Sequence, residues 1–410
     1  MRVDIQSLGT YNRLAQEGAE HAAASLTQMT GIETYVDVTN VTLMSKQDVE
    51  DVFGGTEFVG VQIGLDGGLS GETALAFDRE SASSIVDVLV PGASTGDGDG
   101  DGFDEMARSG INEIGNIMMG GFVDGWADYL GTSVDMSPPT YVERAGTDVL
   151  PDGALDRAEE EHVFVFESQM TAVDQEIDAY IYMLPEYGAF ADMLAASDDH
   201  EDAIPMDKLT VFDEMTRQGA ERAAENVSSM TGIETDVDVS RLSFVPIEDV
   251  PNTARDEVYV GTVMEFKGTP GGYLAILFDE PSARTIVDAT VPMELDDPLG
   301  EMGESAIQEL GNIMTSGFID GWANVLQTSI DHTPPELVHD LGTAILSPIA
   351  GRLGQSQEYA FLMDSTVVTP EGEFNCELYA IPDERKLKEA LDSLLIERSD
   401  QLEADQESLF

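Results

Sequence analysis

Basic side chains are scarce in this sequence of 410 residues. It has 19 lysines and arginines against 80 aspartates and glutamates, so the formal net charge is −61 at pH 7. A chain this acidic repels the phosphate backbone of nucleic acids and the surface of anionic membranes. The composition therefore argues against a nucleic-acid-binding protein and against a protein that inserts into a membrane.

Cysteine is nearly absent, since Cys376 is the only one. One thiol excludes a disulfide or a thiolate metal cluster within the chain, and a lone cysteine more often fills a core than attacks a substrate. No run of about 18 apolar residues is present, as a membrane-spanning helix requires. The N-terminal Met1-Arg2-Val3-Asp4 also lacks the pattern of a signal peptide. These absences predict a cytoplasmic protein.

The acidic residues are spread along the whole chain, while the sequence has only five lysines. In a cytosol of multimolar salt, repulsion between carboxylates is screened within about 3 Å, and their hydration keeps a protein in solution. The pattern therefore favours a protein from a halophile over an acidic protein with a polyanionic role. Because such adaptation explains the charge, the charge by itself says little about partners.

The sequence contains the same pattern twice. MTGIETYVDV at 29–38 returns as MTGIETDVDV at 230–239, an offset of 201 residues (230 − 29). GNIMMGGFVDGW at 115–126 returns as GNIMTSGFIDGW at 311–322, an offset of 196 residues (311 − 115), because the first copy carries extra residues within 94–102. A period this long predicts tandem domains and not a solenoid.

The repeat divides the chain into segments. We predict one domain over residues 1–203, a second over 204–384, and a C-terminal helix with an acidic tail over 385–410. The boundary between the domains falls in the polar segment SDDHEDAIP at 197–205. The helical spacing of leucines at 385–398 predicts a helix docked on the fold, with a partner-binding helix as the alternative.

Each half is predicted to combine long helices with hairpin-linked strands. In the first half we expect helices at 9–30, 79–90 and 103–131, the two longer ones ending at glycines that suit a helix C-cap. Alternating apolar residues predict strands at 33–43, 57–65, 72–77, 133–142, 161–168 and 176–184. Helices grouped between such strands predict an α+β fold, with long helices on an antiparallel sheet and an internal pseudo-two-fold symmetry in each half.

The second long helix of each half carries two distinct faces. Apolar residues at steps of three and four predict a core face. Its members are Ile111, Ile114, Met118, Phe122 and Trp126, and in the second half Ile307, Leu310, Met314, Phe318 and Trp322. Glu113 and Asn116 lie on a different face, one turn apart, as do Glu309 and Asn312. Considered alone, this face fits either a site or a solvated helix surface.

Glycines stand beside these polar pairs, at Gly115, Gly120, Gly121, Gly311 and Gly317. Glycine inside a helix costs about 1 kcal/mol relative to alanine. Several glycines in one helix therefore indicate close approach, either of another backbone within the fold or of a partner.

The polar pair belongs to a longer spaced motif. From Ser109 the steps to Glu113, Asn116 and Pro139 are four, three and 23 residues. The second half repeats these steps at Ser305, Glu309, Asn312 and Pro335. The motif resembles the signature of the CheC/CheX/FliY family of chemotaxis phosphatases, which dephosphorylate the response regulator CheY. Since each half is similar in length to a whole CheC chain, the protein looks like two CheC units fused in tandem, from a halophilic archaeon.

The resemblance implies a role for each residue of the motif. Hydrolysis of an aspartyl phosphate needs a water held in line with the phosphorus, and a carboxamide can orient it without repelling phosphoryl oxygens. Asn116 and Asn312 are therefore expected to orient the water. Glu113 and Glu309 are expected to anchor the active-site lysine of the response regulator, and the serines and prolines of the motif to support the site.

The first long helix of each half lacks the motif. Counting back from the terminal glycines, Arg13 and Gln16 take the positions of the Glu and the Asn in the first half, and Thr39 takes that of the proline. In the second half the pair becomes Glu214 and Arg217. We therefore expect one working site per half.

The resemblance also implies the partners. Phosphorylated CheY is the expected partner, with CheD as a second one. Mg²⁺ would be held by the carboxylates of the response regulator, so no cofactor or metal site is expected in this chain. The run DGDGDG at 97–102 imitates a calcium loop, but Arg108 stands where that loop needs a bidentate Glu. The alternative function is a non-catalytic adaptor that binds CheY or CheD in the chemotaxis and motor-switch pathway.

Overall fold

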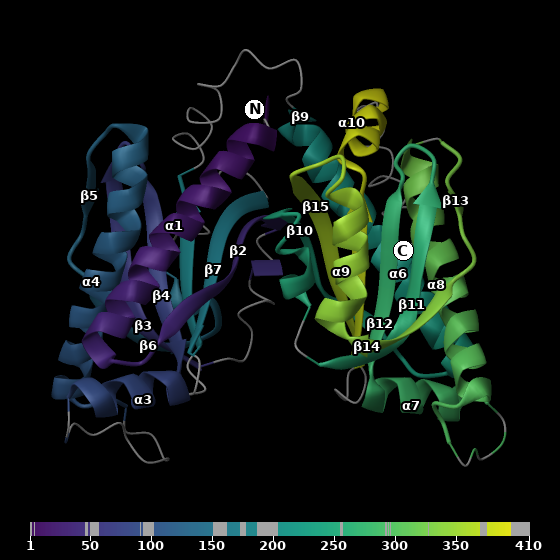
Figure 1. The fold of residues 1–410 in the computed structure, drawn as a ribbon, viewed down its shortest axis with the longest axis horizontal. Helices are drawn as coiled ribbons and strands as arrows, with labels where there is room; N and C mark the ends of the chain where they lie inside the picture. Colours follow the sequence, from purple (N-terminus) through teal and green to yellow (C-terminus); the bar gives the residue numbers. More distant parts are fainter. Residues whose placement is uncertain are drawn as a thin grey trace, which may run out of the picture. The chain divides into compact units, whose positions relative to one another are not determined.

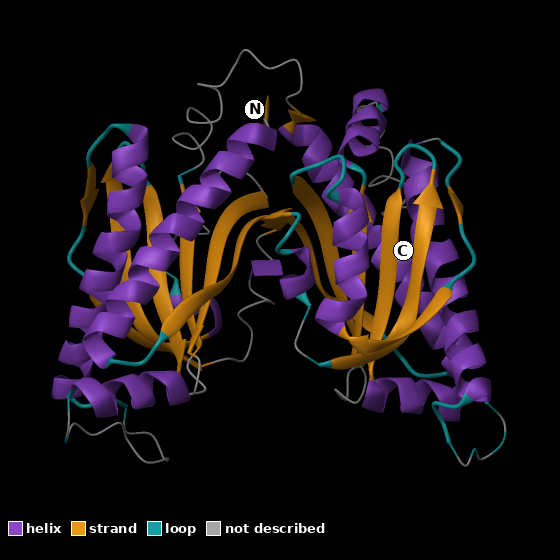
Figure 2. Ribbon diagram, viewed as in Figure 1, coloured by secondary structure: helices purple, strands orange, loops and turns teal. Residues whose placement is uncertain are grey.

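The protein forms two α+β units in the computed structural model (Figure 2). The described residues are 2–3, 5–45, 48–49, 57–90, 92, 102–150, 162–172, 178–186, 204–254, 257–291, 293, 295, 297–326, 328–369 and 375–394. One unit comprises residues 6–200 and is called the first half below. The other, called the second half, comprises residues 201–410 together with residues 1–5. The boundary at 203 stays a prediction, because residues 187–203 lie outside the described residues.

The first half follows the predicted order of elements. Its helices are α1 (Ile5–Thr30), α3 (Arg79–Leu89) and α4 (Glu105–Leu130), with a short 3₁₀ helix η1 (Gly146–Val149). Its strands are β2 (Thr34–Ser45), β3 (Glu57–Gly67), β4 (Gly71–Asp78), β5 (Val134–Met136), β6 (Thr140–Ala145), β7 (His162–Ala172) and β8 (Asp178–Pro185). The single strand predicted at 133–142 is wrong. Pro138 and Pro139 lack the N–H that a strand needs, and they separate β5 from β6.

The second half repeats this order with additions. Its helices are α6 (Met206–Thr231), α7 (Glu280–Thr290), α8 (Glu301–Leu326), α9 (Gly342–Leu353) and α10 (Glu384–Ser393), with a 3₁₀ helix η2 (Val250–Thr253). Its sheet strands are β10 (Asp236–Pro246), β11 (Val258–Lys267), β12 (Gly272–Asp279), β13 (Asp331–His332), β14 (Glu336–Leu341), β15 (Tyr359–Val368) and β16 (Asn375–Pro382). A separate pair joins β1 (Arg2–Val3) to β9 (Ile204–Pro205).

Strand order reveals the internal duplication within each half. The first half has the order β2-β7-β8-β4-β3-β6, with antiparallel neighbours throughout. Exchanging β2 with β6, β3 with β7 and β4 with β8 gives the same order read backwards. The second half has the matching order β10-β15-β16-β12-β11-β14. Each half therefore consists of two repeats of one long helix and three strands, related by the predicted pseudo-two-fold symmetry.

The two long helices of each half cover one face of its sheet (Figure 1). They cross at a glycine. On α1, a Cβ added at Gly18 would lie 2.8 Å from the carbonyl oxygen of Phe122 on α4. On α6, a Cβ added at Gly219 would lie 3.1 Å from the carbonyl oxygen of Phe318 on α8. The same close crossing thus occurs in both halves, and it fixes α4 and α8 against their partner helices.

The opposite face of each sheet is also covered. In the second half, α9 places Ile345, Leu346 and Ile349 in a buried cluster with Leu277 and Tyr379 from the sheet. In the first half, a smaller cluster forms around Val142, Val149 and Leu150. Because both faces are occupied, the consecutive residues 274–278 of the central strand β12 are all buried, which explains their continuous apolar sequence.

Helix α10 is part of the second half and not an appendage. It follows β16 as α7 follows β12, so the pseudo-symmetry makes the two helices counterparts. Leu387, Ala390 and Leu391 are buried where α10 contacts α6, α8 and β15. The remainder of the predicted C-terminal segment, from residue 395 on, lies outside the described residues.

The lone cysteine is expected to fill a core, and no membrane-spanning helix is expected. Cys376 is fully buried in β16, and burial raises the pKa of its thiol well above the ordinary value, so it is a core residue. In the described part of the chain, no helix is both long and apolar enough to cross a lipid bilayer.

Candidate functional site

Helix α4 is fixed at both ends by its sequence. The Asp104 carboxylate caps the N-terminus and accepts hydrogen bonds from the N–H groups of Met106 (3.0 Å) and Ala107 (2.8 Å). Gly131 ends the helix in the left-handed conformation, with φ of 61°, which only glycine adopts without strain. These caps fix where each turn of α4 lies, and hence which residues face solvent.

The inward face of each site helix is the one that its apolar spacing predicts. All ten residues of the predicted core faces on α4 and α8 are buried, with Trp126 and Trp322 at 0% exposure. Trp126 stacks on Tyr11 of α1, with ring centroids 6.0 Å apart, and Trp322 packs against Phe212 of α6 at 5.2 Å. Each tryptophan sets the rotation of its helix, so the residues on the other side point outward.

The Glu and Asn of the motif lie on that outward face. Glu113 and Asn116 on α4 are exposed, and so are Glu309 and Asn312 on α8. At a spacing of three residues on a helix, their Cβ atoms are about 5–6 Å apart. Within the described residues none of the four side chains makes a hydrogen bond or an ion pair. Each half thus presents a carboxylate and a carboxamide, side by side and available to a partner.

The glycine between each pair brings the helix close to the sheet. A Cβ added at Gly115 would clash with the side chain of Val61 on β3, and one at Gly311 would clash with Thr262 on β11. The close approach that the glycines indicate is therefore made within the fold at these positions. Gly120 is different, because its nearest neighbour is the Met136 side chain at 3.9 Å.

The serine of the motif shares the outward face with the pair. Ser109 and Ser305 are both exposed, two turns or less before the Glu and Asn. The Ser305 hydroxyl donates to the carbonyl of Glu301 at 2.9 Å, one turn earlier on α8. We call the outward row formed by the Met, Ser, Glu and Asn positions at 106, 109, 113 and 116, and their counterparts in α8, the site ridge.

The proline of the motif is tied to the helix by a residue that the sequence analysis missed. The side-chain amide of Gln308, which directly precedes Glu309, donates to the carbonyl of Pro335 at 2.6 Å. At the symmetry-related place in α1, the amide of Asn12 donates to the carbonyl of Thr39 at 2.9 Å. The only signal in the sequence was an amide residue one position before the Glu position.

In α4 the same position holds Asn112, which is one methylene shorter than Gln308. Its Oδ1 is buried, and it has no hydrogen-bond partner among the described residues. The amide tether between helix and strand is thus made in α1 and α8, whereas the structure shows no such bond from Asn112. The two site helices therefore differ in how firmly the proline segment is held.

The first long helices carry other residues at the equivalent places. Arg13 on α1 and Glu214 on α6 are exposed, while Gln16 and Arg217 are partly buried. The Glu214 carboxylate accepts a hydrogen bond from the Gln218 amide at 3.2 Å. Neither α1 nor α6 presents a free Glu and Asn pair.

An ion pair joins β6 to the start of α3 beside the first site helix. Arg79 forms a salt bridge with Glu143, and the Tyr141 hydroxyl donates to the same carboxylate at 3.0 Å. The guanidinium of Arg108 on α4 lies over the Tyr141 ring, 5.4 Å from its centroid. Burial, and then the hydrogen bond to Glu143, raise the pKa of Tyr141 above its usual range.

The second half makes the equivalent contact with the acidic and basic residues exchanged between helix and strand. Glu280 stands at the position of Arg79, and His339 at that of Glu143, with His339 Nε2 lying 3.0 Å from a Glu280 oxygen. Glu304 also replaces Arg108. In both halves the contact joins equivalent elements, β6 to α3 and β14 to α7. The basic residue lies on the helix in the first half and on the strand in the second.

The potential metal ligands do not gather at the site. In the regions that the structure describes, no three His, Cys, Asp or Glu side chains come together as a metal site requires. Residues 97–101 of the calcium-like run lie outside those regions.

Comparison with known proteins decides the family. CheC1 of Halobacterium salinarum is 35% identical to this chain over 192 residues, which cover 47% of this chain and 96% of that protein. The chain belongs to the CheC-like family. The family model matches it twice, at residues 106–143 and 302–339, that is, from α4 into β6 and from α8 into β14. Each match contains the Glu, Asn and Pro of the spaced motif, and the chain is a tandem CheC family protein.

Further relatives cover at most half of the chain. The CheY-P phosphatase CheC of Bacillus subtilis is 25% identical over 184 residues, covering 44% of this chain and 88% of that protein. The CheY-P phosphatase CheX of Thermotoga maritima is 35% identical over 80 residues, covering 20% and 48%. The crystal structure of FliY from Thermotoga maritima covers 47% of this chain and 96% of that one, with 21% identity and a TM-score of 0.38.

Proposed function

We propose that the protein hydrolyses the aspartyl phosphate of a CheY-type response regulator, at one site in each half. Two family members similar to this chain are named CheY-P phosphatases. The observation that carries the proposal is the exposed Glu and Asn pair, without partners of its own among the described residues, on the outward face of α4 and again on α8.

In this proposal Asn116 and Asn312 orient the attacking water. The carboxamide donates one hydrogen bond and accepts another, so it can hold a water in line with the phosphorus and the leaving carboxylate oxygen. Being neutral, it adds no repulsion toward the phosphoryl oxygens. Little covalent chemistry is required of the protein, because an aspartyl phosphate is already activated and positioning supplies most of the rate.

Glu113 and Glu309 have a different role in this proposal. A carboxylate that faced the phosphoryl group would repel it, whereas a carboxylate one turn away can pair with a cation of the partner. We assign the two glutamates to the active-site lysine of the response regulator, which places the phosphoryl group over the Asn. Ser109, Ser305, Pro139 and Pro335 support the geometry of the site.

The proposal also includes a metal ion, a compartment and a second partner. Mg²⁺ is held by the carboxylates of the response regulator, and this chain contributes no cofactor. The reaction takes place in the cytoplasm, where response regulators receive their phosphate. A protein of the CheD type is a second partner whose contact surface we leave open.

The test follows loss of phosphate from CheY of the same organism, phosphorylated with a small phosphodonor, at multimolar KCl. The wild-type protein should hasten the loss. Asn116→Ala and Asn312→Ala should each reduce the rate, and the double variant should abolish the acceleration. Asn324→Ala is the matched control, because Asn324 is an exposed asparagine of α8 away from the pair.

Two outcomes would count against the proposal. A double variant as active as the wild type would show that the asparagines are not catalytic. If neither protein accelerated the loss but both bound phosphorylated CheY, the protein would be the non-catalytic adaptor.

A further inference from the structure

Large apolar side chains are exposed at few places in the part of the chain that the structure describes. These are Tyr35, Val88, Met106, Ile117, Val258, Met293, Met302 and Leu341. The two methionines Met106 and Met302 occupy the same position of the two halves, and they are 59% and 51% exposed. Because an exposed apolar side chain occurs at the same position in both halves, we expect it to have the same function in each.

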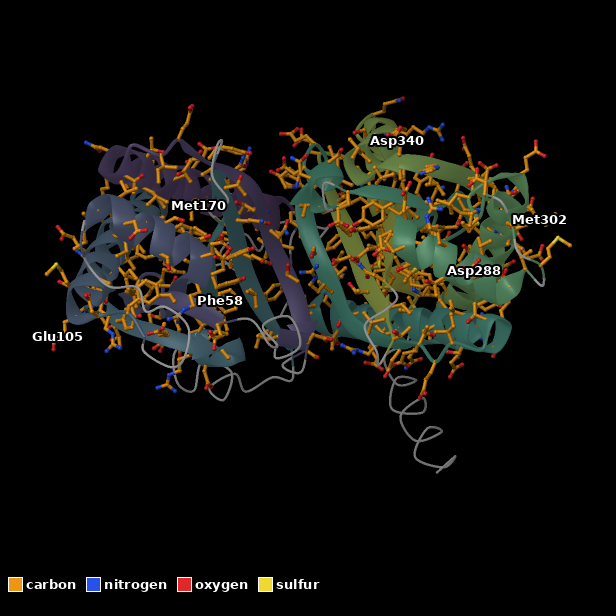
Figure 3. The ribbon with its side chains drawn as sticks, turned by 90° about the horizontal axis from the view of Figure 1, so that it is seen from below. Phe58, Glu105, Met170, Asp288, Met302 and Asp340 are labelled. Atoms are coloured by element: carbon orange, nitrogen blue, oxygen red, sulfur yellow. The ribbon has the colours of Figure 1, made fainter. Side chains whose placement is uncertain are left out.

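Both methionines lie on the site ridge. Met106 precedes Glu113 by seven residues, and Met302 precedes Glu309 by the same number. Seven residues make almost two full helical turns, so each methionine lies on the face of its Glu, about 10 Å along the axis. Figure 3 shows Met302 at the outer edge of the second half, its side chain pointing away from the ribbon.

Neither methionine is buried in a core of the fold. Met106 is in the first turn of α4, where the backbone N–H is already capped by Asp104. Acidic residues stabilise this turn, and Glu105 and Glu301 directly precede the two methionines. A methionine in the first turn provides no cap, and more than half of each residue is exposed to a partner.

The proposed reaction identifies what covers the methionines. A globular domain of about 100 residues has a radius of gyration of about 13 Å. A receiver domain whose phosphorylated aspartate reaches Asn116 therefore covers at least 10 Å of the ridge in one direction. Exposed carboxylates lie in both directions along the helix, at Asp124 and Asp320 toward the C-terminus and at Glu105 and Glu301 toward the N-terminus. Among the described residues, only the N-terminal direction also presents a large exposed apolar side chain at the same position of both halves, the methionine.

We propose that Met106 and Met302 are docking residues for the phosphorylated receiver domain. Each thioether side chain enters an apolar patch on the partner while the Glu and Asn engage its phosphorylation site. This inference rests on the proposed function. Methionine suits the role, because its unbranched, polarizable side chain adapts to the surface it meets. Apolar burial is also not weakened by the screening that weakens ion pairs in concentrated salt.

The experiment isolates one site at a time. Met106→Gln is made in the Asn312→Ala protein, and Met302→Gln in the Asn116→Ala protein. Removing the buried apolar contact should raise KM for phosphorylated CheY about tenfold and leave kcat within about twofold. Met106→Leu and Met302→Leu should restore KM, because leucine keeps the apolar surface. Tyr35→Gln is the control, since Tyr35 is an exposed apolar residue of β2 away from the ridge.

Binding is measured in parallel on proteins changed at both methionines, to Gln or to Leu, because Asn→Ala removes turnover from a half but leaves its Glu and Met to bind. CheY is held in its activated form by beryllofluoride, so that no turnover is needed. The Gln variants should weaken this binding about tenfold, and the Leu variants should not. Unchanged KM and unchanged binding would overturn the docking role, as would a fall in kcat at constant KM. Inactive single-site proteins that still bind activated CheY through the methionines would instead refute the proposed function.

Discussion

At Gly115 the backbone of α4 lies so close to β3 that no side chain fits between them, and Gly311 repeats this contact on β11. These two glycines stand between the Glu and the Asn of each pair. The short distance between each site helix and its sheet is therefore possible only because glycine has no side chain at this position. The sequence indicated a close approach here, but only the structure shows that the neighbour is a strand of the same half.

Gly115→Ala and Gly311→Ala should each lower the free energy of unfolding by about 1–3 kcal/mol, because the added methyl overpacks against Val61 or Thr262. Gly351→Ala in α9 is the matched control. Nothing lies within 4 Å of a Cβ at that position, so alanine should stabilise the helix by about 0.5–1 kcal/mol. Urea unfolding measures all three. Site variants as stable as the control would contradict the close packing.

Glu221 on α6 should give a pH-dependent effect. Glu221 is exposed on α6, but partial desolvation there, and then the nearby Glu214 carboxylate, raise its pKa. For an acid with a raised pKa, the favourable contribution is present below the unfolded pKa and is lost as pH rises through the folded value. Glu221→Gln should therefore raise Tm at pH 7 and have little effect near pH 4. Glu257→Gln, an exposed carboxylate of the same half, is the control. An equal gain at both pH values would contradict the assignment.

Among the elements, the helix-to-strand tether distinguishes the two site helices. The Gln308 amide donates to the carbonyl of Pro335 in the second half, whereas among the described residues no such bond joins Asn112 to Pro139 in the first. The segment between helix and strand is part of the family motif in both halves. The difference between these two amides is one methylene group.

The tether predicts opposite effects of two substitutions. Gln308→Leu should destabilise the second half by about 1 kcal/mol, because the hydrogen bond is lost. Asn112→Gln introduces the residue that makes the tether in α8, and it should stabilise the first half by a similar amount through the same bond to the carbonyl of Pro139. Differential scanning calorimetry in the same buffer compares both variants with the wild type. A destabilising Asn112→Gln would show that the first half cannot accept the tether.

The elements also show what a sequence can predict. The spacing of Trp126, Phe122 and their neighbours fixed the buried face of α4, and therefore the outward face that holds Glu113 and Asn116. One predicted strand is split into β5 and β6 by two adjacent prolines. The alternation of apolar residues predicted a single strand, because it does not take account of the missing N–H groups.

Other features depend on contacts between distant residues. Gln308 reaches Pro335 only because β14 enters beside α8, and Arg79 meets Glu143 across 64 positions of sequence. Helix α10 could be expected from its leucines, but its place as the counterpart of α7 follows from the strand order. The roles of the Glu and the Asn stay predictions, because both residues are proposed to act on groups of a partner protein.

For the whole molecule, the charge of −61 is the dominant property. Raising KCl from about 0.2 M to about 3 M should raise Tm markedly, because screening removes the repulsion among the 80 acidic side chains. Thermal unfolding followed by circular dichroism measures the effect. Sucrose at the same osmolality is the uncharged comparison, and its general stabilisation by exclusion from the protein surface should be smaller than the effect of KCl. A Tm that stayed constant or fell with KCl would contradict the halophilic interpretation of the composition.

Two homologous halves in one chain create a hazard during folding, because a segment of one half can assemble on the sheet of the other. The reversed pairs oppose such mixing. If the Arg79 helix were to assemble beside the strand of His339, two potential cations would meet, and the reciprocal exchange would set Glu280 against Glu143. We therefore expect each segment to be favoured on its own half, because the exchanged assemblies would bring two basic or two acidic side chains together.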